Sequence, residues 1–239
     1  DPLTMQGESD PITIRGAKVR GGRGVYSQYS VSQNGILAFV EGTSMNQMTM
    51  MELVPGDKAK ELHSESAFFG TFEISPNGKH IAIEEKIRNQ YRLKLYDIER
   101  MQFSVLTEGG SSFNPVWSDS SEMVYYTSIR NREVNIFRYD LKNKTEKLIE
   151  LNWGANNIGL WDVSVDDGQL LVSYMPEGGQ FNLYAIKMDD TVSSRQLTNN
   201  DHVEWGVKLS PDNKWMVYTS EKDMKRGYEI YINRFPEMN

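Results

Sequence analysis

The sequence predicts an all-β protein, a β-propeller of four-stranded antiparallel blades. Three observations support this class: a serine-centred motif recurs five times at nearly constant spacing, segments rich in β-branched and aromatic residues follow each motif, and helical periodicity is nearly absent. Four strands in a unit of about 40 to 50 residues are typical of a propeller blade. Because one blade alone cannot bury both of its faces, consecutive blades must stack.

The recurring motif is an apolar-x-apolar-Ser segment, a short turn and a second apolar run. Its serines are separated by 43, 43, 46 and 46 residues. The segment before each serine alternates as a half-buried strand does, and Gly or Asn in the turn takes a positive φ. The five motifs are Tyr29–Gly35, Phe72–Gly78, Pro115–Ser121, Trp161–Gly168 and Val207–Asn213.

Three further strands are expected in each unit after the turn. The second strands are Ile36–Val40, Ile81–Ile83, Met123–Thr127, Leu170–Tyr174 and Trp215–Thr219. The third strands are Tyr91–Ile98, Asn135–Leu141, Asn182–Met188 and Glu229–Phe235. The fourth strands are shorter and end at Leu62, Leu106–Thr107, Leu148–Ile149 or Leu197–Thr198. Phe72, Trp117 and Trp161 are expected to fill the spaces between blades.

The repeat divides the chain into an N-terminal extension and one propeller domain. The extension covers residues 1–24 and contains Ile12–Ile14, a short strand that could close the ring by pairing with the last blade. The propeller covers residues 25–239, with blades at approximately 25–67, 68–110, 111–156, 157–202 and 203–239.

Several of these motifs resemble TolB-like propeller repeats. They are Phe72–Lys79, Asn114–Ser121, the Tyr-Asp-Ile and Tyr-Asp-Leu third strands, and the closing Leu-Thr pairs. The segments Gly21–Phe39 and Tyr228–Pro236 are similar to propellers that follow a transmembrane segment in bacterial serine/threonine protein kinases and in some winged-helix regulators. The resemblance covers about residues 25–239. It implies a six-bladed propeller that senses or binds a partner, in the periplasmic or extracytoplasmic part of a membrane-anchored signalling protein.

The number of units departs from that family pattern. Five serine motifs are present instead of six, and the fifth unit has no fourth strand before Pro236. We expect a six-bladed domain that is truncated, with Ile12–Ile14 originally pairing in its last blade. A closed five-bladed ring is the alternative.

Composition excludes several function classes. The chain has 26 Lys and Arg against 33 Asp and Glu, a net charge of −7, which disfavours binding to nucleic acid or an anionic membrane. No run of 18 apolar residues occurs, so no membrane span is expected within this chain. The absence of cysteine excludes thiol catalysis, disulfides and thiolate zinc sites. The three histidines are too widely spaced for a paired-His site, and we expect neither a metal nor a cofactor.

The candidate ligand site is the mouth of the propeller channel, where the connections enter the innermost strands. Aromatic, amide and single charged side chains there suit a protein, a peptide or a small polar ligand. The candidate ligand-binding residues are Tyr26, Gln28, Phe69, Phe113, Asn114, Asn157, His202, Glu204 and Trp205. For each of them an ordinary loop role is the alternative.

No catalytic residue is assigned, and the preferred function is non-catalytic binding. The sequence lacks the Gly-x-Ser-x-Gly of hydrolases and the phosphate loop, His-Arg-Asp and Asp-Phe-Gly of kinases. A channel-mouth hydrolase or lyase is one alternative, because His202 and Glu204 would face the same side of a strand. A purely structural scaffold is another. The Met-rich stretch Met45–Met51 could hold a soft metal, although a packed hairpin strand is the simpler interpretation.

Overall fold

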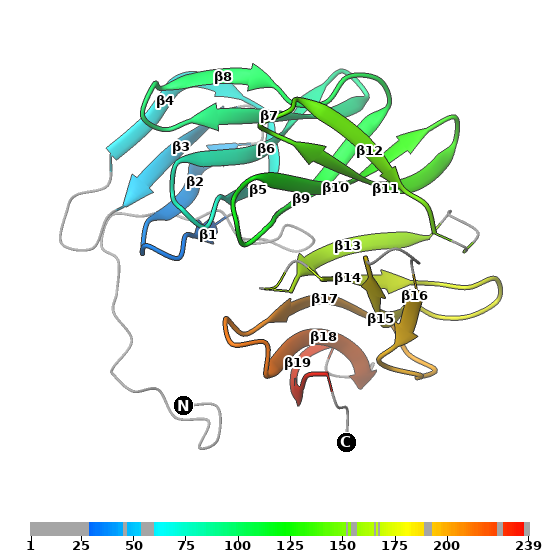
Figure 1. The fold of residues 1–239 in the computed structure, drawn as a ribbon. Helices are drawn as coiled ribbons and strands as arrows, with labels where there is room; N and C mark the ends of the chain where they lie inside the picture. The colour runs from blue at the N-terminus through cyan, green and yellow to red at the C-terminus, as the bar shows by residue number, and fades with distance from the viewer. Residues whose placement is uncertain are drawn as a thin grey trace, which may run out of the picture.

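The computed structural model describes residues 29–44, 47–53, 60–151, 153, 157–164, 166, 168–188, 193–223 and 227–236. These residues form nineteen β-strands and no helix. The strands pair in five separate antiparallel sheets, each made from one stretch of the chain. The sheets follow one another in a propeller arrangement (Figure 1). The predicted all-β propeller class is confirmed.

The five sheets are named first to fifth in chain order. The first contains β1 (Tyr29–Val31), β2 (Leu37–Ser44), β3 (Gln47–Leu53) and β4 (Lys60–Ala67). The second contains β5 (Phe69–Ile74), β6 (His80–Ile87), β7 (Gln90–Asp97) and β8 (Gln102–Val105). The third contains β9 (Ser111–Trp117), β10 (Met123–Arg130), β11 (Glu133–Asp140) and β12 (Thr145–Ile149). The fourth contains β13 (Ile158–Val163), β14 (Gln169–Tyr174), β15 (Asn182–Lys187) and β16 (Ser193–Gln196). The fifth contains β17 (Glu204–Leu209), β18 (Trp215–Asp223) and β19 (Gly227–Arg234).

The first strand of each sheet lies innermost, and these strands pack against one another in the order β1, β5, β9, β13, β17. No comparable packing joins β17 to β1 among the described residues. The described strands therefore form an arc of five sheets, in which no described strand bridges the fifth sheet and the first (Figure 1). The fifth sheet has three described strands where the others have four.

Hydrogen bonds explain why a serine recurs at each turn. The serine hydroxyl accepts a hydrogen bond from an amide at the start of the following strand segment. The five donors are the amides of Ile36, His80, Met123, Gln169 and Trp215, at 2.9 to 3.0 Å from Ser32, Ser75, Ser118, Ser164 and Ser210. The expected positive φ occurs at Gly35, Gly78 and Asn213. The serine motif is therefore a turn signal, in which side chain and backbone close a hairpin.

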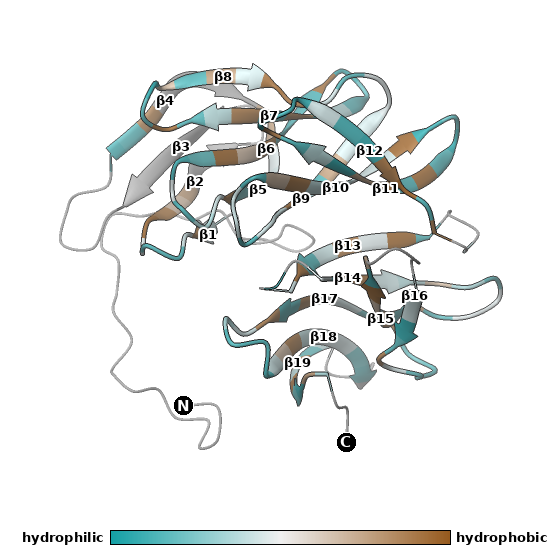
Figure 2. Cartoon of the chain, viewed as in Figure 1, coloured by the Kyte–Doolittle hydropathy of each residue, from teal (hydrophilic) through white to brown (hydrophobic). Residues whose placement is uncertain are grey.

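The hydrophobic core lies between consecutive sheets. Four clusters of buried side chains each join one sheet to the next. Phe72 and Trp117 belong to two of these clusters, and Trp161 packs against a third. Figure 2 shows hydrophilic residues in the connections and also along outer strands such as β12 and β16. The propeller is thus stabilised by sheet-to-sheet packing, as a repeat of this kind requires.

Some predicted features lie outside the described residues, namely Ile12–Ile14, Tyr26, Gln28 and Met45. The strand expected for the Met-rich stretch is present as β3. Within the part of the chain that the structure describes, no helix is long and apolar enough to cross a membrane.

Candidate functional site

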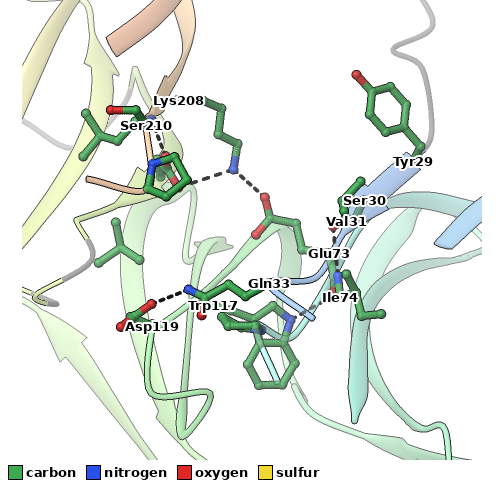
Figure 3. A pocket seen from close by; sticks show the side chains of 15 residues that line it. Tyr29, Ser30, Val31, Gln33, Glu73, Ile74, Trp117, Asp119, Lys208 and Ser210 are labelled. Carbon is green, nitrogen blue, oxygen red and sulfur yellow. Dashed lines mark hydrogen bonds and ion pairs between the residues drawn. The ribbon is translucent and has the colours of Figure 1, made fainter. Parts of the chain in front are cut away.

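A pocket lies at the end of the channel where the inner strands run into the serine turns. Its volume is about 650 Å³, and residues of all five sheets line it. In four of the sheets, the residue two positions before the repeat serine contributes to the wall. These residues are Ser30, Glu73, Asp162 and Lys208 (Figure 3). The repeat therefore delivers side chains from distant parts of the sequence to one place.

β-Bulges in the inner strands direct these side chains. The pairing register with the next strand shifts directly before Asp162 in β13 and Lys208 in β17, and in β5 it shifts between Phe69 and Phe72, just ahead of Glu73. In β17 the bulge contains Gly206, whose φ of +66° lies in the left-handed region that glycine adopts without a Cβ clash. A bulge inserts an extra residue and redirects the strand beyond it. The ends of these strands are thereby aimed at the channel.

An ion-pair group crosses the pocket. The ammonium of Lys208, in the fifth sheet, contacts the carboxylate of Glu73 in the second sheet and lies 3.5 Å from Asp162 Oδ1 in the fourth. Glu73 and Asp162 are 25 % and 17 % exposed, so both carboxylates are only partly open to water. Burial opposes the charged form of Lys208, but the two carboxylates outweigh burial and raise the pKa of this lysine. Lys208 is therefore a fixed positive charge between non-adjacent sheets.

Backbone and amide hydrogen bonds hold this end of the channel in place. Asp162 Oδ2 accepts a hydrogen bond from the amide of Leu209 at 2.7 Å, and the indole of Trp117 donates to the Glu73 carbonyl at 2.9 Å. The side-chain amide of Gln33 donates to Asp119 Oδ1 at 2.5 Å, which joins the first sheet to the third. The pocket walls are therefore pre-organised, which lowers the entropic cost of binding a ligand.

The pocket offers a ligand a mixed surface. Three carboxylates and one ammonium among the lining residues give an excess of acceptors, while Trp117, Val163 and Leu209 supply apolar area. Such a combination suits a polar ligand with hydrogen-bond donors or positive charge. Among the described residues, no group of three or more His, Asp or Glu side chains is placed to hold a metal ion.

The predicted channel-mouth residues lie at the opposite ends of the same inner strands. Phe69 is the first residue of β5, is 2 % exposed and packs in the core between the first and second sheets. Phe113 and Asn157 are half-buried at the entries to the third and fourth sheets. Trp205 packs against Tyr228 with the two rings tilted by 37° and their centroids 5.2 Å apart. Ligand binding at this mouth stays a prediction.

Asn114 takes part in a contact between two sheets. It has a φ of +54° at the bulge of β9, and its amide donates to Glu84 Oε1 at 2.7 Å. The amide and hydroxyl of Thr71 also donate to Glu84. Burial raises the pKa of Glu84, although these hydrogen bonds favour its charged form. A Cβ at Gly70 would overlap the Glu84 carboxylate, so glycine there permits the contact.

The structure brings His202 and Glu204 together, as the i, i+2 spacing predicts. His202 Nε2 lies 3.6 Å from Glu204 Oε1, and the side chain of Asn200 donates to the same oxygen at 2.8 Å. The Glu204 side chain is 2 % exposed. Its Oε2 and the neighbouring Ser220 hydroxyl have no hydrogen-bond partner among the described residues. A buried acceptor of this kind is costly unless a water or ligand meets it.

Sequence reasoning missed the pocket residues Glu73, Asp162 and Lys208. It treated the residues before each serine only as strands that bury alternate side chains. A signal was present, because charges of opposite sign recur at one position of the repeat, two residues before the serine. An inner strand with a charged residue at that position has to place it in the channel or pair it with a partner.

Comparison with known proteins supports the fold. No family model matches the chain. The putative TolB from Agrobacterium tumefaciens is similar with a TM-score of 0.74 and 18 % identity, over 89 % of this chain and 78 % of that one. The likeness is one of fold. TolB from Acinetobacter baumannii has a TM-score of 0.72 and 16 % identity, over 87 % of this chain and about half, 51 %, of that one.

The same fold also occurs in an enzyme. An oligogalacturonate lyase in complex with manganese is similar with a TM-score of 0.65 and 15 % identity, over 87 % of this chain and 62 % of that one. A shared propeller fold therefore does not distinguish a binding protein from an enzyme, and the function has to be argued from the site.

Proposed function

We propose that this chain is a non-catalytic binding propeller that takes a peptide, a protein segment or a small polar ligand at its channel. The pocket at the serine-turn end carries this proposal. It is roomy, it is lined by all five sheets, and Lys208, Glu73 and Asp162 form a fixed charged group inside it. The fold likeness to TolB proteins agrees with a binding role.

The wider role that we propose is a sensor or interaction domain of a bacterial signalling protein, in a periplasmic or extracytoplasmic position. Support comes from the segments Gly21–Phe39 and Tyr228–Pro236, which resemble propellers joined to serine/threonine kinases and winged-helix regulators. A ligand with different affinity for two states of the parent protein would transmit the signal. If deletion of this region left ligand response and partner binding of the parent unchanged, the sensor role would be wrong.

A defined library of short peptides and polar metabolites, screened by ligand-observed NMR, tests the pocket directly. We expect at least one compound to bind the wild-type chain and to lose affinity about ten-fold or more in Lys208→Met, since a hydrogen bond to a charged group contributes about 1.5–3 kcal/mol. Lys79→Met, on the exposed part of a serine turn, is the matched control and should bind normally. Binding that both variants retain would rule out the pocket as the site.

A channel-mouth hydrolase or lyase is a second candidate, favoured by one observation. The buried Glu204 has an oxygen without a described partner and a histidine 3.6 Å from its other oxygen. A carboxylate and an imidazole at this separation can exchange a proton with a substrate. A hydrolase and lyase substrate screen with His202→Ala and Glu204→Ala decides the matter, because activity unaffected by both changes excludes this site.

A further inference from the structure

The pocket at the serine-turn end has more negative than positive charge on its wall. Three carboxylates line it, those of Glu73, Asp119 and Asp162, against the single ammonium of Lys208 among the described residues. Burial raises the pKa of Glu73, and Asp162 adds to this effect, although Lys208 opposes it. Lys208 therefore compensates the carboxylates only in part, and they would stabilise a second positive group in the pocket.

The Lys208 ammonium keeps one hydrogen-bond donor for a ligand. An ammonium group has three N–H donors. Among the described residues, its partners are the Glu73 carboxylate and Asp162 Oδ1, the latter at 3.5 Å. The Lys208 side chain is 44 % exposed and lies on the pocket wall, where Figure 3 shows it reaching toward Glu73. Its third N–H is therefore available to an acceptor of a ligand that lies beside the two carboxylates.

The two carboxylates are fixed in position, but their acceptor capacity is not fully used. Asp162 Oδ2 accepts the Leu209 amide at 2.7 Å, whereas the 3.5 Å from Oδ1 to Lys208 exceeds the length of an ordinary N–H···O hydrogen bond. The Glu73 backbone is held because its carbonyl accepts the Trp117 indole at 2.9 Å. Both carboxylate side chains are partly exposed. A second ammonium can therefore contact both of them from the open side of the pocket.

An apolar surface belongs to the same wall. Tyr29 and Val31 of β1 line the pocket and are each 58 % exposed. They flank Ser30, which has the same place in the repeat as Glu73 and Asp162. Apolar side chains that are exposed in a pocket favour a ligand that covers them. A ligand that uses the whole wall therefore carries a positive charge, an acceptor next to it and an apolar side chain.

We propose that the pocket binds the amino terminus of a peptide or protein chain, an inference that rests on the proposed ligand-binding function of the same pocket. The α-ammonium contacts Glu73 and Asp162, and the first carbonyl oxygen accepts the third N–H of Lys208. The first side chains pack on Tyr29 and Val31. Capture of a terminal amine is a general mode of peptide recognition. A lysine in the middle of a peptide fits less well, because its side chain has no carbonyl next to the ammonium.

Tripeptide amides that differ in their first residue provide the probes, each with a free and with an acetylated amino terminus. Their affinity for the full chain is measured by isothermal titration calorimetry. We expect at least one free peptide to bind. Its acetylated form should bind about ten-fold more weakly or worse, because acetylation removes the charge that strengthens the hydrogen bonds.

Two variants test the carboxylates. Asp162→Asn and Glu73→Gln should each weaken binding of the free peptide by about ten-fold and leave that of the acetylated peptide nearly unchanged. Asparagine keeps an oxygen that can accept the Leu209 amide, so the pocket wall is preserved. Glu122→Gln is the matched control and should bind the free peptide like the wild type, since this exposed residue follows a serine turn and is not among the residues that line the pocket.

Four results would overturn the proposal. They are no binding by any free peptide, equal affinity of the free and acetylated forms, full affinity in both carboxylate variants, and tight binding of an acetylated tripeptide amide with a central lysine. Tight here means an affinity equal to that of the best free peptide, which would show that any ammonium is sufficient. The proposed function fails separately, because it requires only that some compound of the library bind in a way that depends on Lys208.

Discussion

The second to fourth sheets and the fifth sheet use the same repeat but bury it to different extents. Leu93, Ile136 and Leu183 are covered completely by the sheet that follows, while Ile230 at the same position is largely exposed. The local structure is nevertheless the same, because the serine turn and the strand-closing hydrogen bond of the fifth sheet match those of the others. Local hydrogen bonds therefore define a blade, and the neighbouring blade supplies its burial.

We expect the largest difference in the free energy of unfolding when the side chain at this shared position is shortened to alanine. Leu183→Ala should lower the free energy of unfolding by about 2–5 kcal/mol, because it creates a cavity in a packed cluster. Ile230→Ala should change it by less than about 0.5 kcal/mol, because the side chain already meets water. Urea denaturation measures both. Equal losses would mean that the two positions are equally covered.

The serine turns allow a second comparison. Ser75 is fully buried and accepts the amides of His80 and Lys79, so Ser75→Ala leaves buried donors unpaired and should cost about 1–3 kcal/mol. Ser210 is only half-buried, and water can replace its hydroxyl. Ser210→Ala should therefore cost less than about 1 kcal/mol in the same denaturation experiment. The reverse order would show that burial does not control these turns.

The ion pair across the channel should add little to stability. Lys208 is 44 % exposed, and solvent screens a pair of this exposure, so Lys208→Met should cost no more than about 1 kcal/mol. Salt should reduce the difference between the two proteins. A loss of several kcal/mol would indicate that Lys208 is a structural clamp and would weaken its assignment to a ligand site.

The smallest expected effect is a pH dependence of stability that comes from Glu84 in the second sheet and has no counterpart in the fifth sheet. The folded-state pKa of Glu84 is raised, so its contribution is present below the unfolded pKa and is lost as pH rises through the folded value. The stability of the wild type relative to Glu84→Gln should therefore decrease as pH rises from the ordinary pKa range of a glutamate through the raised folded-state pKa. Thr219 takes the matching place in the fifth sheet, and Thr219→Val should show no such trend.

Much of the fold could be predicted because the repeat pattern arises from contacts between residues that are close in the sequence. Each element of the repeat has a local role. The serine makes a hydrogen bond, the turn glycines adopt a positive φ, and the alternating apolar residues are buried. The site was harder to predict. The contact between Lys208 and Glu73 depends on how five sheets are arranged and on bulges that reverse simple alternation. The proximity of His202 and Glu204 was predicted correctly because the two residues are only two positions apart, although His202 precedes β17 and does not belong to it.

The contact between Lys208 and Glu73 joins residues 135 positions apart in an arc that is not closed by strand pairing in its described part. This ion pair is a non-covalent link between the second and the fifth sheet, and it lies in the pocket. A ligand whose charged group replaces either partner breaks this contact. One lysine thus links two sheets that are far apart in the sequence, inside the pocket that we propose as the ligand site.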